Sequence, residues 1–105
     1  MVWVYLVVAG LLETGMVIGL KFSEGFTRLW PTVGMLVSGG LSFLLLSLAM
    51  KGLSAGTAYA VWTGIGAAGA VTLGILFFKE PADLLRVGAV ALIIAGVVAL
   101  KFTEA

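Results

Sequence analysis

The distribution of apolar residues along the chain constrains its fold more than any other feature. Four apolar stretches, each roughly 17–21 residues long, match the length that a helix needs to cross a hydrocarbon core about 30 Å thick. They comprise residues 2–20, 31–50, 58–78 and 84–100. Because backbone groups cannot stay unpaired in lipid, each stretch is predicted to be a transmembrane helix. The sequence thus predicts an all-α membrane protein whose residues 1–105 form a single four-helix domain.

The composition excludes several functional classes. Hydrophobic residues make up 62% of the chain and charged residues 10%, whereas a typical soluble domain has about 45–50% and about 25%. Six basic and five acidic residues provide no basic surface for nucleic acid. The chain has no Cys and no His, so we expect neither thiolate nor imidazole metal sites, nor a Ser-His-Asp triad. We therefore expect no enzyme activity, no nucleic-acid partner, no metal and no cofactor.

The basic residues give a weak indication of orientation. The first and third loops share one side of the membrane, and the second loop and the C-terminal end share the other. The first group holds Lys21, Arg28, Lys79 and Arg86, and the second holds Lys51 and Lys101. This excess favours a cytoplasmic position for the first and third loops, with both termini outside. Because the excess is small, insertion of the chain in both orientations stays open as an alternative.

Glu13 is the residue most indicative of function. It lies near the middle of the first predicted helix, with Gly10 and Met16 three residues to either side. A carboxyl group at that depth costs a few kcal/mol to insert, and such residues commonly mark ion or substrate pathways. The alternative is a permanently protonated Glu that only forms hydrogen bonds between helices. We interpret Glu13 as a group that exchanges protons and binds a cation.

The third predicted helix carries polar and aromatic residues on one face. Tyr59, Trp62, Thr63 and Gly66 follow the spacing of residues that share a helix face. Tyr and Trp donate hydrogen bonds to a carboxylate and offer aromatic faces to a cation. Ser42 on the second helix adds a hydroxyl group, although such serines often bond only to their own backbone. Together with the carboxyl group of the first helix, these residues predict a pocket for a small organic cation.

Lys101, at the end of the fourth predicted helix, has two interpretations. The simpler one is a lysine whose ammonium group extends to the membrane surface, and the other is a role in tuning the pocket.

Four short helices enclose little space, so a second copy of the chain is needed to complete a pathway. Transporters often place their site at the midplane between inverted repeats. A small chain inserted in both orientations supplies that inversion as a dimer.

Several motifs resemble those of the small multidrug resistance transporters. These are Glu13 in the first of four short helices, the run KFSEGFTRLWPTVG at 21–34, and GTAYAVWTGIGAAGA at 56–70. The WTGIG run, FFKEP at 77–81 and Leu100–Lys101 look like the guanidinium-exporter subtype. The resemblance spans essentially the whole chain.

The resemblance implies an antiparallel dimer in the bacterial cytoplasmic (inner) membrane, exporting guanidinium and substituted guanidiniums in exchange for protons by alternating access. Carried over by motif, Glu13 binds protons and substrate, and Ser42, Tyr59 and Trp62 surround it. Gly10, Met16, Thr63 and Lys101 are possible pocket or tuning residues. The expected partners are the small organic cation, protons, the lipid bilayer and a second copy of the chain.

One departure from the subtype keeps two alternatives open. Exporters of this subtype usually have Trp where this chain has Met16. The chain is then alternatively an exporter of quaternary ammonium and other drug cations, or one subunit of a paired heterodimer with a homologous chain. A helix bundle without transport activity is a further alternative, but it leaves the pairing of Glu13 with Tyr59 and Trp62 unexplained.

Overall fold

A computed structural model describes residues 1–103, which form four α-helices and no strand. The helices are α1 (Val2–Phe22), α2 (Leu29–Ala49), α3 (Ala55–Phe77) and α4 (Leu84–Thr103). Each is long and apolar enough to cross a membrane, which confirms the expected all-α membrane fold.

The helix bounds differ from the predicted ones by a few residues. Helix α3 begins at Ala55 rather than at residue 58, because the Thr57 amide donates to Ser54 Oγ at 3.4 Å and Ser54 caps the helix. Helix α2 begins at Leu29, two residues before Pro31, since proline is tolerated in the first turn. At the start of α4 the Arg86 amide donates to Asp83 Oδ1 at 2.8 Å, so Asp83 caps the helix.

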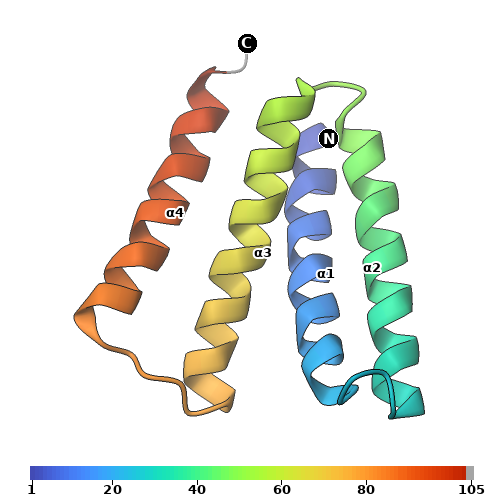
Figure 1. The fold of residues 1–105 in the computed structure, drawn as a ribbon. Coiled ribbons are helices and arrows are strands. Elements are labelled where there is room, and N and C mark those ends of the chain that lie inside the picture. The colour runs from blue at the N-terminus through green and yellow to red at the C-terminus, as the bar shows by residue number, and fades with distance from the viewer. Residues whose placement is uncertain (104–105) are drawn as a thin grey trace.

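The four helices lie in a flat row in which α1 packs between α2 and α3 (Figure 1). Helix α4 packs along α3, and Lys101 near its end contacts α1, at Trp3. The chain measures 44 × 34 × 17 Å, so it is little more than one helix layer thick. Figure 1 also places the α1–α2 and α3–α4 loops at one end of the row and the α2–α3 loop at the other.

Two serines of α2 tie it to α1. Ser38 Oγ donates to the carbonyl of Leu12 at 2.6 Å, and Ser42 Oγ donates to that of Ala9, also at 2.6 Å. Hydrogen bonds of this kind between transmembrane helices are typically worth about 0.6 kcal/mol each. They bring α2 alongside the segment of α1 that precedes Glu13.

The buried core lies toward the end of the bundle where α2 connects to α3. It is formed by apolar residues of α1, α2 and α3, namely Leu6, Ala9, Leu46, Ala49, Ala58, Val61 and Trp62. The α4 helix contributes no buried residue. Packing in this structure is therefore concentrated in three helices, and the fourth is left largely uncovered.

The connection between α3 and α4 folds back onto α3. The Glu80 amide donates to the Gly74 carbonyl at 3.2 Å, and the Glu80 carboxylate packs against Gly74, where a Cβ atom would lie 2.6 Å away. Arg86 Nη2 donates to Glu80 Oε1 at 2.7 Å. Lys79, at φ 57°, reverses the chain just before this contact, so the loop is anchored at both ends.

A single chain leaves much of its apolar surface exposed. Its accessible surface is 6457 Å², compared with about 5,500 Å² for a compact soluble protein of the same mass. Large apolar side chains cover much of this surface, among them Leu84, Leu85 and Leu92 of α4 at 88%, 82% and 75% exposure. Such a surface suits lipid and further protein, but not water.

Candidate functional site

Glu13 lies within α1 and is the one acidic residue inside a helix among residues 1–103. Its carboxyl group packs directly against the backbone of Gly66 on α3. A Cβ atom at Gly66 would lie 2.5 Å from Glu13 Cδ and 3.0 Å from Glu13 Cγ. The space that a side chain at position 66 would need is therefore filled by the Glu13 carboxyl group.

One carboxyl oxygen at this site has no partner within the described chain. Glu13 Oε2 is buried, and no hydrogen-bond donor of the described residues reaches it. A buried polar atom without a hydrogen bond is costly, and native structures rarely keep one without a reason. The hydrogen-bonding capacity of this oxygen is therefore unmet among the described residues, which makes Glu13 the candidate functional group.

Thr14 joins α1 to α3 beside the carboxyl group. Its hydroxyl lies 3.3 Å from the carbonyl of Gly10 and 3.3 Å from that of Gly66, so it can donate within α1 or across to α3. Its methyl group packs against Gly69, where a Cβ atom would lie 3.1 Å from Thr14 Cγ2. Small residues of α3 therefore let the polar pair Glu13 and Thr14 approach the backbone closely.

Ser42 and Trp62 form a buried hydrogen-bonded chain that starts on α1. Ser42 Oγ donates to the Ala9 carbonyl at 2.6 Å and accepts from Trp62 Nε1 at 2.8 Å. Ala9 is one turn from Glu13 along α1, and Trp62 is one turn from Gly66 along α3. The structure thereby brings three of the four principal predicted residues, Glu13, Ser42 and Trp62, to the same level of the bundle.

Two further aromatic rings flank Trp62. The Phe43 ring centroid lies 5.4 Å and the Tyr59 ring centroid 5.7 Å from that of Trp62, both in tilted arrangements. Trp62 is buried, whereas Tyr59 is 57% exposed. Tyr59 therefore reaches the site by stacking on Trp62, and its hydroxyl group stays accessible to a ligand or to a second chain.

The predicted tuning residues take different positions. Met16 packs against α2, where a Cβ atom at Gly39 would lie 2.8 Å from its Sδ atom. Gly10 is buried against the Ile65 side chain, so its role in this chain is close helix packing. Thr63 is exposed on α3.

Lys101 does not join the site within the chain. Its Nζ atom lies 5.7 Å from the ring centroid of Trp3, a cation–π contact near the start of α1. Trp3 is ten residues from Glu13, which corresponds to roughly 15 Å along a helix. The lysine therefore ties the end of α4 to the start of α1, well away from the carboxyl group.

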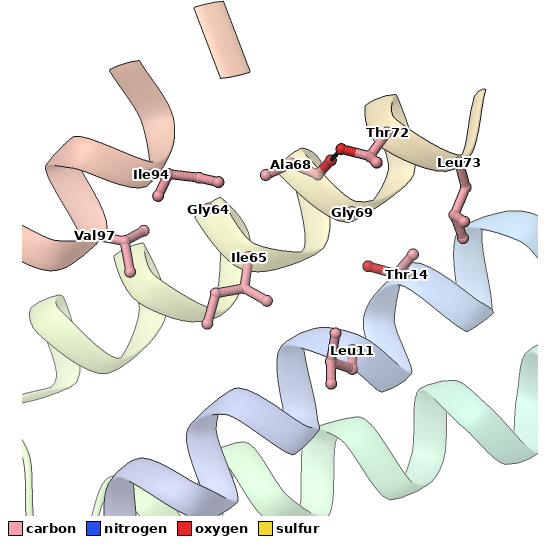
Figure 2. A pocket seen from close by; sticks show the side chains of 10 residues that line it. All are labelled: Leu11, Thr14, Gly64, Ile65, Ala68, Gly69, Thr72, Leu73, Ile94 and Val97. Atoms are coloured by element: carbon pink, nitrogen blue, oxygen red, sulfur yellow. Dashed lines mark hydrogen bonds between the residues drawn. The ribbon is translucent and has the colours of Figure 1, made fainter. Parts of the chain in front are cut away.

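A cavity lies beside the α1–α3 contact and extends to α4. It has a volume of about 420 Å³ and is lined by Leu11 and Thr14 of α1, residues 64–73 of α3 in part, and Ile94 and Val97 of α4 (Figure 2). Glu13 does not line it. Its two polar side chains, Thr14 and Thr72, both have carbonyl partners on the helix backbone. This cavity is apolar and carries no group that would select a charged ligand.

Sequence reasoning missed two residues of the site. Phe43 packs on Trp62, but a Phe in an apolar stretch carries no signal that separates it from ordinary lipid-facing residues. Thr14 was overlooked because it neighbours Glu13 in sequence, which usually places two helix residues on different faces. Only the close approach of α3 lets both side chains contact the same glycine.

Four helices that are long and apolar enough to span a membrane, with one carboxyl group inside a helix among residues 1–103, are typical of a small multi-pass membrane transporter. The family model described as "Small Multidrug Resistance protein" matches residues 1–93. The chain belongs to the small multidrug resistance family.

Curated relatives match over almost their whole length. A protein named guanidinium exporter from Yersinia pseudotuberculosis is 54% identical over 104 residues, covering 99% of this chain and 100% of the relative. Proteins with the same name are 50% identical in Proteus vulgaris over 104 residues and 48% identical in Escherichia coli over 103 residues. The Escherichia coli alignment covers 98% of both chains.

The Ser42 network predicts different costs for two otherwise matched substitutions. Ser42→Ala removes the bond to α1 and also leaves the buried Trp62 N–H unpaired, whereas Ser38→Ala removes only a bond to α1. An unpaired buried donor costs about 1–3 kcal/mol, so Ser42→Ala should lower the free energy of unfolding more than Ser38→Ala does. Unfolding of the purified protein by SDS in mixed micelles measures both values, and equal losses would contradict the network.

Proposed function

We propose that this protein exports guanidinium and substituted guanidinium ions in exchange for protons, working as an antiparallel dimer by alternating access. The observation that carries the proposal is the buried, unpartnered Oε2 atom of Glu13 beside Gly66. The names of the relatives, which are 48–54% identical, support guanidinium as the cargo. The family supports a bacterial cytoplasmic membrane as the location.

The chemistry of the site suits a flat cation rich in hydrogen-bond donors. A carboxylate accepts two parallel hydrogen bonds from one guanidinium group. The stacked rings of Tyr59 and Trp62 offer aromatic faces, which attract cations through their quadrupoles. Trp62 Nε1 is bonded to Ser42 and the Trp62 side chain is buried, so in this arrangement the exposed Tyr59 ring is the one that a cation can contact, with Trp62 supporting it from behind.

Coupling to protons follows from competition for one carboxyl group. Glu13 can hold a proton or form an ion pair with a cation, but a proton and a cation cannot both neutralise it. Protons that arrive from one side then displace cargo toward the other, provided that the site faces the two sides in turn. In a dimer the two Glu13 carboxyl groups interact. The apparent pKa values then belong to the pair of groups and not to either residue alone.

The shape of the chain supports a dimer. The row of helices is 17 Å thick, and α4 has no buried residue, so a single copy leaves the site open along one face. A second copy would cover Tyr59 and the exposed apolar side chains of α4. The distribution of basic residues, four at one end and two at the other in the sequence, is weak enough to permit both orientations.

Glu13→Gln is predicted to abolish guanidinium uptake driven by a pH gradient in proteoliposomes. Glutamine keeps the shape of the side chain but neither titrates nor pairs with a cation. Glu24→Gln is the matched control, because Glu24 lies in the α1–α2 loop, and it should transport as the wild type does. Proton-driven uptake at the wild-type rate by the Glu13 variant would contradict the mechanism.

The antiparallel dimer predicts two orientations of the same chain. The chain contains no Cys, so Lys51→Cys at the exposed end of α2 introduces a unique label site. A membrane-impermeant maleimide should label about half of these thiols from each face of intact cells or vesicles. Labelling from one face only would contradict the homodimer and favour a dimer paired with a homologous chain of opposite orientation.

Met16 favours a second candidate cargo class, alkyl-substituted guanidiniums or small quaternary ammonium ions. Methionine offers no hydrogen-bond donor, but its flexible thioether adapts to irregular apolar groups. It packs on Gly39 of α2, one turn from Glu13 along α1. A cation with few hydrogen-bond donors and more apolar surface therefore loses less binding free energy beside the Met16 side chain than guanidinium does.

Met16→Trp is predicted to shift preference toward unsubstituted guanidinium, because the indole adds a donor next to Glu13. A hydrogen bond to a charged group is worth about 1.5–3 kcal/mol, so the ratio of transport rates for guanidinium and a hydrophobic substituted cation should rise about tenfold or more. Met16→Phe adds a ring without a donor and should leave the ratio near the wild-type value. An unchanged ratio in the Trp variant would remove position 16 from selectivity.

A further inference from the structure

We propose that Gly66 is a positioning residue for cation binding, which holds the Glu13 carboxyl group in place by leaving a notch on α3 for it to occupy. This inference rests on the proposed function of Glu13 as the cation and proton site. It assigns to Gly66 a role beyond close helix packing, which is the usual role of small residues in membrane helices.

The atoms that fill the notch belong to the functional group itself. A Cβ atom at Gly66 would meet Oε2, Cδ and Cγ of Glu13 and no other residue among its nearest contacts. Elsewhere along α3 the neighbours are different: a Cβ atom at Gly64 would meet Val97 and Ile93, and one at Gly69 would meet Thr14. A methyl group at position 66 would therefore collide with the far end of a flexible side chain, not with a helix backbone.

The separation of α1 and α3 is set by other contacts. Ile65 packs onto Gly10, and the Thr14 hydroxyl lies 3.3 Å from the Gly66 carbonyl. These contacts flank the notch on both helices and do not involve the carboxyl group. A methyl group at position 66 can thus displace the carboxyl group by rotation of the Glu13 side chain, while the helices keep their places.

Displacement of the carboxyl group matters because pairing with guanidinium depends on direction. Two parallel N–H···O bonds form only when the carboxylate and the guanidinium lie close to one plane, with the two carboxylate oxygens directed at the cation. A shift of about 1 Å in a positioned group can change rates by roughly 100-fold. The notch holds the carboxyl group at one depth and one orientation, one turn from Trp62 along α3.

The test is a double-substitution cycle that exchanges size between positions 13 and 66. Gly66→Ala in the wild-type background should weaken guanidinium binding, seen as a Kd and a transport KM raised about tenfold or more. In the Glu13→Asp background the carboxyl group is one methylene shorter, so its carbon takes the Cγ position, 3.0 Å from the added methyl group instead of 2.5 Å, and the collision is smaller. There Gly66→Ala should raise Kd by a clearly smaller factor, relative to Glu13→Asp alone, than it does in the wild-type background.

The matched control is Gly34→Ala on α2, where no atom of the described chain lies within 4 Å of the added Cβ atom. It makes the same glycine-to-alanine change within a membrane helix and should leave Kd and KM unchanged. Isothermal titration with guanidinium chloride in detergent gives Kd, and uptake into proteoliposomes gives KM. Circular dichroism and gel filtration establish that each variant keeps its helices and its oligomeric state.

The outcomes separate the inference from the function on which it rests. Wild-type affinity in Gly66→Ala, or the same loss in the Glu and Asp backgrounds, would overturn the positioning role and leave guanidinium transport standing. A wild type that neither binds nor transports guanidinium would overturn the proposed function itself. If Gly66→Ala fails to fold but the double variant folds, the collision with Glu13 is supported; if both fail, Gly66 serves packing and the inference is overturned.

Discussion

The close approach of α1 and α3, held by the Gly10–Ile65 and Thr14–Gly66 contacts, places the Glu13 carboxyl group against the backbone of Gly66. Inserting a carboxyl group in the middle of a membrane helix costs a few kcal/mol of free energy. The neighbouring residue must therefore leave room for the carboxyl group. Glycine meets this need because it has no side chain. The crossing of α1 and α3 is therefore shaped around one functional group, and the flanking contacts of Gly10 and Thr14 hold that crossing together.

A rigid core borders this contact on one side. Trp62 belongs both to the buried cluster of α1, α2 and α3 and to the hydrogen-bonded chain that passes through Ser42 to Ala9. Its ring is held by packing and by its indole N–H, and it in turn supports Tyr59 and Phe43. The aromatic wall of the site is thus supported from within the chain, whereas the open face beside α4 has no such support.

The small size of the chain explains why the site is incomplete in one copy. Helices in a single layer can present polar groups on a surface but cannot enclose them, and α4 packs along α3. The proposed pathway between the two sides of the membrane therefore requires a second copy of the chain. The exposed apolar side chains of α4 and the accessible Tyr59 ring are consistent with this dependence.

The sequence by itself determined the class of fold, because a helix must be about 20 apolar residues long to cross a bilayer and four such stretches leave no other solution. It also singled out Glu13 as the candidate functional residue, since charge is rare at that depth. Only the tertiary structure decided which partners each side chain has. Ser42 binds Ala9 and Trp62, Lys101 lies over Trp3, and Thr14 joins Glu13 at Gly66. These pairings depend on the rotation and depth of each helix against its neighbours, and apolar stretches as uniform as these specify length far better than they specify a contact face.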